Sequence, residues 1–362
     1  MEDERQAILA AIGALLGPLL TGLETLVFVG RNLHPPHLAQ LVEAVADRAT
    51  PLRTAAETFA ATPLPASAAT IGTLLGEAAT ATLRAFDELV AAPASPDGVF
   101  VAYRALRHIA RANEALYSLC TVLPPVSTYF LPPSQRKGVA LLDRLNGADG
   151  RRQNVGLMHA RNARQERGGY SVYVPEYMDE NVPLPLIMAL HGGSGHGRDF
   201  LWSWLGDARA HGAILVCPTS QGGTWSLMEP ETDGDRLLAI LDEVRSLWPV
   251  DESRLLLTGM SDGGTFTYLA GLRQGAPFTH LAPVAASFHP MLLGFLDPAR
   301  LRRAPITIIH GALDWMFAVD MAREAHSAFA GAGATVHLRE IADLSHTYPR
   351  EENEGLLNWL KG

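Results

Sequence analysis

The stretch Gly259-Met260-Ser261-Asp262-Gly263-Gly264 decides the fold. The apolar run 254–258 comes directly before it and has the length and composition of a buried strand. Apolar residues at helical spacing follow it over 265–272. A strand, Gly-x-Ser-x-Gly and a helix in this order are typical of a nucleophile elbow, whose glycines allow the backbone to approach closely. The pattern predicts that the Ser261 hydroxyl points into a crevice at the carboxyl edge of a sheet. The alternative is a glycine-rich turn with an incidental serine.

Composition limits the classes of protein to which the chain can belong. Its 362 residues predict two domains, and 48% hydrophobic content is enough for a sizeable core. A net charge of −9 argues against a nucleic-acid partner, which requires a basic face. Cys120 and Cys217 lie far apart and match no disulfide framework or zinc spacing, so we expect no metal and no cofactor.

The N-terminal segment is apolar but does not have the pattern of a targeting sequence. Residues 1–5 are net acidic, whereas a secretory signal begins with positive charge. The apolar run over 7–30 is interrupted by Gly13, Gly17, Pro18, Thr21 and Glu24. These interruptions favour partly buried helices over an integral membrane span. Cytoplasmic location is the default expectation.

Residues 1–125 are rich in Ala and Leu and predict an all-α N-terminal domain. We expect helices over 6–20, 36–48, 66–92 and 97–121. The last has an apolar stripe made of Phe100, Tyr103, Leu106, Ala110, Tyr117 and Cys120. Such stripes must be buried. The domain's own helices, the mouth of the catalytic domain or a second copy of the chain could bury them. Because the apolar run over 7–29 is longer than one surface helix needs, the domain is expected to act as a cap beside the active-site edge, or as the contact of a homodimer.

The proline pairs Pro124-Pro125 and Pro132-Pro133 predict a linker over 126–150, and alternating strands and helices follow over 151–362. Strands are expected at 155–160, 170–174, 184–190, 213–218, 254–258, 282–288, 305–310 and 335–341, with helices at 198–210, 233–247, 319–330 and 351–360. The first two strands should form a hairpin. The alternation predicts a mostly parallel sheet covered on both faces, which binds ligands at the carboxyl ends of its strands.

A serine nucleophile needs a base and an acid that orients the base, and after an elbow these follow in the order acid, then histidine. Asp314 leaves the carboxyl end of the strand 305–310, and His346 follows the last strand. Asp320 and Asp297 are weaker candidates for the acid. The histidines within strands or helices are interpreted as structural: His310, His326 and His337.

The small residues after the strand 184–190, Gly192-Gly193-Ser194-Gly195, are suited to an oxyanion hole, where backbone N–H groups must approach the reacting oxygen closely. We assign one donor to the N–H of Gly193 and the other to that of Asp262. Ser194 is the neighbouring alternative to Gly193. A phosphate-binding loop is not favoured, because the Gly-Lys-Ser/Thr ending is missing.

Together these segments resemble the α/β-hydrolase superfamily and, within it, the phospholipase/carboxylesterase and polyhydroxybutyrate-depolymerase-like serine esterases. The matching stretches are Leu190-His191-Gly192-Gly193, Gly259 to Gly263, His310 to Asp314 and Ser345-His346. The resemblance covers the chain from about Gly169 onward and implies hydrolysis of a small-molecule carboxylic ester through an acyl-enzyme. The helical N-terminal domain departs from the minimal esterase pattern.

Aromatic residues beside the motif loops are candidate walls of the substrate pocket. We predict that the pocket is lined by Ser194, Trp202, Trp225, His289, Trp315 and Phe317. Further candidates are Phe200, Trp204 and Phe288. Two alternatives to an esterase stay open. One is a peptidase or amidase that uses the same triad, and the other is a binding protein on a hydrolase scaffold.

Overall fold

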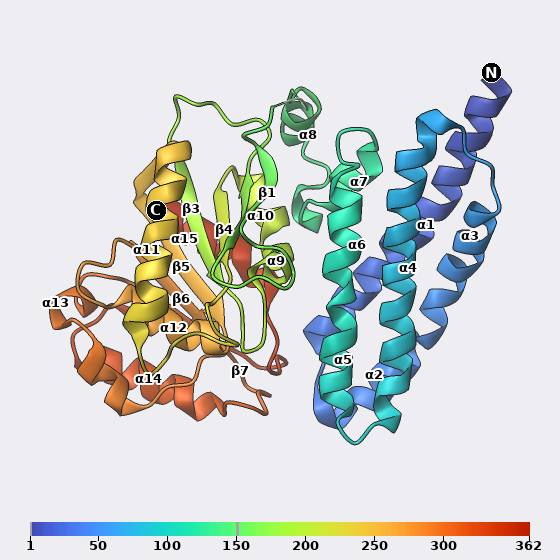
Figure 1. Ribbon diagram of the computed structural model, residues 1–362. Helices are drawn as coiled ribbons and strands as arrows, with labels where there is room; N and C mark the ends of the chain where they lie inside the picture. The colour runs from blue at the N-terminus through green and yellow to red at the C-terminus, as the bar shows by residue number, and fades with distance from the viewer. Residues whose placement is uncertain (1, 150–151) are drawn as a thin grey trace. The chain divides into compact units, whose positions relative to one another are not determined.

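The computed structural model describes residues 2–149 and 152–362, and the chain forms two compact units, Met1–Phe130 and Leu131–Gly362 (Figure 1). The segment 126–150, expected to be a linker, contains the end of one helix and the whole of another. The first unit is helical, and the second is built on one sheet.

The first unit is a helical bundle in which α4 packs against α1, α3, α5 and α6. Its α-helices are α1 (Glu2–Asn32), α2 (Leu38–Val45), α3 (Thr50–Ala60), α4 (Ala69–Ala91), α5 (Gly98–Leu106), α6 (His108–Tyr117) and α7 (Pro124–Tyr129). Short 3-10 turns lie between them: η1 (Pro35–His37), η2 (Ala46–Ala49), η3 (Ala66–Ala68) and η4 (Ala92–Ala94).

Two helix predictions for this unit were wrong in extent. The first helix, which contains Pro18, does not end at Leu20 but continues to Asn32, because its apolar face stays buried in the bundle. The segment 97–121 is two helices rather than one. Around Arg107 the backbone makes 3-10 hydrogen bonds, from Arg107 N–H to Arg104 O and from Ala110 N–H to Arg107 O, which separate α5 from α6.

Within the described residues, α1 is the one helix that is long and apolar enough to cross a membrane, with a mean hydropathy of 1.8. Of the window that meets this test, 44% is buried inside the protein. The fully buried side chains include Leu15, Leu19, Leu23 and Leu26, at the spacing of one helix face. This is the composition of a central helix in a bundle as well as of a membrane span.

The second unit contains an eight-stranded sheet with the order β1-β2-β4-β3-β5-β6-β7-β8. Its strands are β1 (Gly156–Ala160), β2 (Tyr170–Val174), β3 (Leu184–Leu190), β4 (Ile214–Pro218), β5 (Val250–Met260), β6 (His280–Val284), β7 (Ile306–Gly311) and β8 (Val336–Ile341). β2 is antiparallel to β1 and β4, which confirms the expected hairpin, and the other neighbours are parallel. This mostly parallel sheet has the strand order of the α/β-hydrolase fold, as predicted.

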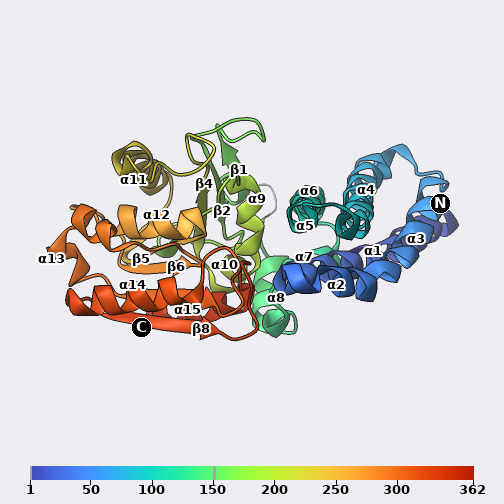
Figure 2. The same cartoon turned by 90° about the horizontal axis from the view of Figure 1, so that it is seen from below.

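Helices cover both faces of the sheet, with α11 and α12 on one side of β5 and β6 and α15 on the other (Figure 2). The α-helices are α8 (Val139–Asn146), α9 (Gly197–Phe200), α10 (Leu205–His211), α11 (Pro230–Leu247), α12 (Asp262–Gly271), α13 (Pro298–Leu301), α14 (Val319–Gly331) and α15 (Asn353–Lys361). The 3-10 turns are η5 (Pro133–Gln135), η6 (Leu201–Ser203), η7 (Pro290–Phe295) and η8 (Arg350–Glu352). The helix expected over 198–210 is divided into α9, η6 and α10.

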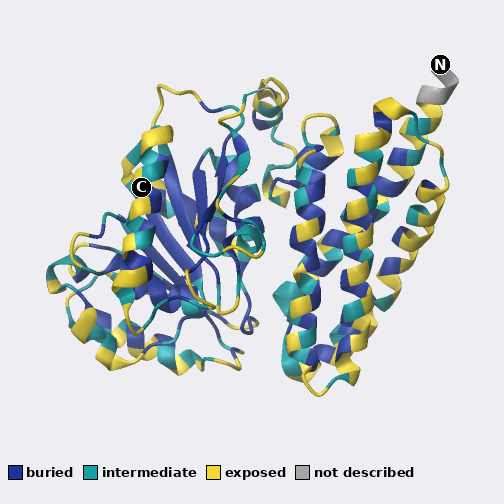
Figure 3. Cartoon of the chain, viewed as in Figure 1, coloured by how far each residue is buried: buried dark blue, intermediate teal, exposed yellow. Residues whose placement is uncertain are grey.

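The core of this unit lies in the central strands, which are buried along most of their length (Figure 3). Every residue of β2 and β4 is buried, as is typical of strands covered on both faces. Cys217 lies in β4 and is fully buried, whereas Cys120 of the helical unit is half-buried. The rigid centre therefore supports the loops at the carboxyl ends of β3, β5, β7 and β8.

Candidate active site

Ser261 lies between the end of β5 and the start of α12 in a strained backbone conformation. Its φ is 57° and its ψ is −122°, a region that costs a non-glycine residue about 1–3 kcal/mol. Backbone hydrogen bonds hold it there: its N–H donates to Val284 O at 2.9 Å, and its carbonyl oxygen accepts from Thr265 N–H at 2.9 Å. The surrounding structure therefore imposes the sharp turn that the sequence predicted.

Two glycines allow this turn to form beside β3. A Cβ atom on Gly259 would lie 2.4 Å from Gly263 O. One on Gly263 would lie 2.5 Å from the carbonyl oxygens of both Leu190 and His191. Because real Cβ atoms do not come so close to backbone oxygens, only glycine lets the elbow pack against the loop that follows β3.

The side chains of Ser261, Asp314 and His346 converge at the carboxyl ends of β5, β7 and β8. The Ser261 hydroxyl donates to His346 Nε2, with an Oγ to Nε2 distance of 3.1 Å. His346 Nδ1–H donates to Asp314 Oδ2 at 2.7 Å. All three residues are more than nine-tenths buried. The order and distances suit proton transfer from the serine to the histidine.

Asp314 is held as a carboxylate. Burial acts to raise its pKa, but hydrogen bonds from His346 and from the amide of Phe317, together with the charge of His346, outweigh burial and lower the pKa below its ordinary value. Its Oδ1 accepts from the N–H groups of Met316 and Phe317, at 2.9 and 2.8 Å. These bonds fix one carboxylate oxygen and leave the other for the imidazole.

His310, on β7, contacts the same carboxylate, although its place in a strand led us to interpret it as structural. Its Nε2 lies 2.8 Å from Phe317 O and 3.4 Å from Asp314 Oδ2. Burial lowers the pKa of His310, so the ring is neutral at pH 7 and donates one proton toward the loop that carries Asp314. The sequence carried no signal for this contact, because it depends on how the loop folds back.

The expected oxyanion donors lie next to each other beside Ser261. Asp262 is the first residue of α12, where a backbone N–H has no acceptor within the helix. Gly193 approaches it so closely that a Cβ atom there would lie 2.7 Å from Asp262 Oδ2. That carboxylate oxygen accepts from Thr224 Oγ1 at 2.5 Å. Asp262 thus begins a helix and Gly193 lies in the neighbouring glycine loop, two kinds of position that can supply backbone N–H groups to an oxyanion.

Ser194 does not serve as the alternative donor. Its N–H donates to Gly223 O at 3.0 Å, and its φ of 53° turns the backbone away from the extended form. The amide is therefore used to hold one loop to another. Gly193 therefore stays the predicted donor of this loop.

The candidate pocket residues separate into two groups. Phe317 places its ring edge-on to His346, with centroids 5.3 Å apart, and Trp315 is 37% exposed in the same loop. Trp225 is buried instead: its Nε1–H donates to His191 O at 2.7 Å. Trp202 is buried in η6, His289 caps η7 and is exposed, and Trp204 and Phe288 are in the core.

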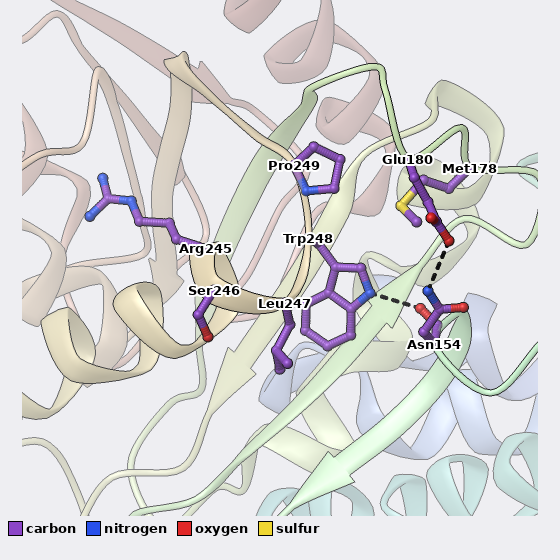
Figure 4. A pocket seen from close by; sticks show the side chains of 8 residues that line it. All are labelled: Asn154, Met178, Glu180, Arg245, Ser246, Leu247, Trp248 and Pro249. Carbon is purple, nitrogen blue, oxygen red and sulfur yellow. Dashed lines mark hydrogen bonds between the residues drawn. The ribbon is translucent and has the colours of Figure 1, made fainter.

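A separate pocket of about 340 Å³ lies at the other end of the sheet, where β3 and β5 begin (Figure 4). Its charged groups are already paired, since Glu180 accepts from Arg152 and Arg245 bonds to Glu252. Trp248 Nε1–H donates to Asn154 O. The pocket is thus a poor candidate for the reaction, because ligands of parallel sheets bind at the carboxyl ends of strands.

No family model matches the chain. A bifunctional acetylxylan esterase/xylanase of Neocallimastix patriciarum is 26% identical over 188 residues, covering 50% of this chain and 26% of that protein. A protein of Aspergillus niger described as "Probable feruloyl esterase C" is 32% identical over 109 residues, covering 27% of this chain and 39% of that protein. The chain thus spans well under half the length of these curated relatives.

Solved structures of hydrolases are also similar to the chain. S-formylglutathione hydrolase from Staphylococcus aureus has a TM-score of 0.46 and 16% identity, covering 54% of this chain and 92% of that one. A thermostable esterase has a TM-score of 0.40 and 18% identity, covering 57% of this chain and 60% of that one. The sheet order and the elbow define the second unit as an α/β-hydrolase fold. In sequence, the chain is similar to two curated esterases.

Proposed function

We propose that the protein hydrolyses carboxylic esters through an acyl-enzyme, with Ser261 as nucleophile, His346 as base and Asp314 as the acid that orients it. The carrying observation is the continuous hydrogen-bond path from Ser261 Oγ to His346 Nε2 at 3.1 Å and from His346 Nδ1 to Asp314 Oδ2 at 2.7 Å. A serine hydroxyl is a weak nucleophile until a base removes its proton, and the distance from Ser261 Oγ to His346 Nε2 supports His346 in that role.

The proposed reaction has two halves. Ser261 Oγ attacks the ester carbonyl carbon while His346 takes the hydroxyl proton, and the N–H groups of Gly193 and Asp262 stabilise the oxyanion. The carbon–oxygen bond to the alcohol breaks, and His346 returns the proton to the leaving alcohol. Water then attacks the acyl-enzyme with His346 again as base, which releases the acid and restores the serine.

The names of the curated relatives suggest which acyl groups to test. They are an acetylxylan esterase and a feruloyl esterase, which act on acyl groups of very different size. Phe317 beside His346 and the exposed Trp315 offer apolar contact to the substrate. We therefore include acetyl and feruloyl esters with simple carboxylic and phospholipid esters in the substrate panel.

The test is a set of p-nitrophenyl esters of increasing acyl length, run with a fluorophosphonate probe that labels active serines. Labelling lost in Ser261→Ala, with ester turnover in the wild type, supports the proposal. Absence of both in the folded wild type would favour a binding protein. Matched amide substrates hydrolysed faster than esters would favour a peptidase or amidase instead.

For the helical unit we propose a role in limiting access of esters or in forming a homodimer. Support comes from large apolar side chains that the unit exposes: Leu9, Phe28, Val90, Phe100 and Val122. Light scattering of the full chain tests the dimer, and replacement of Phe28 and Phe100 by serine should then yield monomers. An unchanged mass and acyl preference would contradict both roles. Cytoplasmic location stays a prediction that cell fractionation tests.

A further inference from the structure

The guanidinium of Arg167 lies between the two loops that follow β3 and β4. Its Nη1 donates to Gly195 O at 2.7 Å, in the loop that carries Gly193. Its Nη2 donates to Gly222 O and to Ser220 Oγ, both at 2.5 Å, in the other loop. Its Nε donates to Ser220 O at 3.1 Å. One side chain therefore supplies donors to three backbone oxygens in two loops.

Three more contacts join the same two loops. Ser194 N–H donates to Gly223 O at 3.0 Å, and Ser220 N–H donates to His191 Nε2 at 3.1 Å. His191 therefore carries its proton on Nδ1, which lies 2.7 Å from Gly192 O. Trp225 Nε1–H reaches His191 O. Every residue from 191 to 195 except Gly193 thus takes part in these hydrogen bonds.

We propose that Arg167 is a positioning residue, which holds the loop 191–195 against the loop 219–223 so that the N–H of Gly193 stays directed at the reacting carbonyl oxygen. The inference rests on the proposed esterase function. Arg167 does not touch the reacting atoms in this scheme, and it acts through the carbonyl oxygens of Gly195 and Gly222.

The physical reason is preorganisation. An oxyanion donor accelerates the reaction only if it already points at the developing charge, because reorientation during the reaction would use up the gain. A glycine loop is flexible, and the carbonyl oxygens of its neighbours need donors when water is excluded. A planar guanidinium with five N–H groups meets several of them at once, which a lysine ammonium cannot do with the same geometry.

The loop after β4 has further hydrogen bonds in which Arg167 takes no part. Asp233, near the start of α11, accepts from Gln221 N–H at 2.9 Å and from Ser226 N–H at 2.8 Å. Asp233 N–H in turn donates to Ser226 Oγ at 3.0 Å. A change at Arg167 should therefore loosen the loop 191–195, which keeps its three other contacts, without unfolding the loop after β4.

The experiment compares Arg167→Lys and Arg167→Met with the wild type on one p-nitrophenyl ester. We expect kcat to fall about 10- to 100-fold in Arg167→Met, the scale of a displaced oxyanion donor, with KM changed less than about threefold. The kcat of Arg167→Lys should lie between those of the wild type and Arg167→Met, because lysine keeps the positive charge but lacks the planar, forked set of N–H donors. Binding of a trifluoromethyl ketone, which forms an oxyanion on the serine, should weaken in proportion to kcat/KM. Millimolar guanidinium should restore part of the activity of Arg167→Met.

Arg164→Gln is the matched control, because Arg164 is a half-buried arginine of the same segment that donates to Asp199 Oδ1 at 2.7 Å. Its kcat and ketone affinity should stay at the wild-type level. Wild-type kcat in Arg167→Met, a rise in KM alone, or failure of both variants to fold would overturn the positioning role. If the wild-type protein hydrolyses no ester, the esterase proposal is overturned instead, so the two failures are distinguishable.

Discussion

Asp314 and His346 are 32 residues apart in the chain, yet Oδ2 of one lies 2.7 Å from Nδ1 of the other. Each sits in the loop that leaves one of two neighbouring parallel strands, β7 and β8. Parallel strands bring their carboxyl ends to the same edge of a sheet, so the two short loops meet without a long excursion of the chain.

Ser261→Ala should abolish ester hydrolysis and leave the fold intact. The substitution removes only Oγ, and the backbone bonds to Val284 and Thr265 stay in place. Loss of a triad nucleophile lowers kcat by several orders of magnitude, roughly 10⁶-fold where it has been measured. Initial rates and circular dichroism check the two halves of the prediction. Activity near the wild-type level would remove Ser261 from the mechanism.

His346→Ala should be about as damaging as the loss of the serine, and Asp314→Asn should be severe but less so. Since the residues act as a unit, the double variant should be little slower than His346→Ala. The measurement is kcat/KM of both single variants and the double variant. Losses that add in free energy would show that the two residues work independently.

Gly263→Ala should lose both stability and activity. The new Cβ atom would lie 2.5 Å from the backbone oxygens of Leu190 and His191, so the oxyanion loop must move. Gly331→Ala is the control, because nothing lies within 4 Å of its Cβ position at the end of α14. Thermal unfolding and kcat of both variants test this. A Gly263→Ala enzyme as stable and active as the control would contradict the close packing.

Asp207→Asn should stabilise the protein at neutral pH. Burial raises the pKa of Asp207 to about 6 from an ordinary value of 3.8, although Asn353 donates to its carboxylate at 3.0 Å. The native state therefore binds this proton more tightly than the unfolded state. The stability that this provides is complete below pH 3.8 and is lost as pH rises through 6.

At pH 7.5 the buried charge therefore costs up to about 3 kcal/mol, because the pKa is raised by about two units and each unit corresponds to about 1.4 kcal/mol. Urea unfolding at pH 4.5 and pH 7.5 should show a clearly larger gain in stability for Asp207→Asn at the higher pH. Asp242→Asn, in an exposed ion pair with Arg245, should change stability by less than about 1 kcal/mol at either pH. An equal gain at both pH values would show that the charge of Asp207 is not the cause.

The sequence located the sheet and the three converging residues because their signals are local. Runs of apolar residues gave β2 and β3 with the observed bounds, since a buried strand has the same surroundings along its length. Asp314 and His346 stood out because each follows such a run. The turns were harder to predict: the break at Arg107 consists of local 3-10 hydrogen bonds, and no residue type marks it.

The supporting contacts could not be predicted in this way. Arg167 bonds to residues 28 and 53 positions away, and its own segment shows no unusual pattern. Trp225 was expected to line the pocket because it follows a strand, but its ring stacks on Phe266 and its N–H holds His191. Such roles depend on which loops meet in three dimensions.

The two cysteines give the protein natural reporters, one for each unit. Cys217 is fully buried in β4, and burial raises the pKa of its thiol, so a thiol reagent can reach it only when the sheet opens. Cys120 lies half-buried in the helical unit. The rates at which the two thiols react under native conditions would therefore measure the opening of the sheet and of the bundle separately, without an added label.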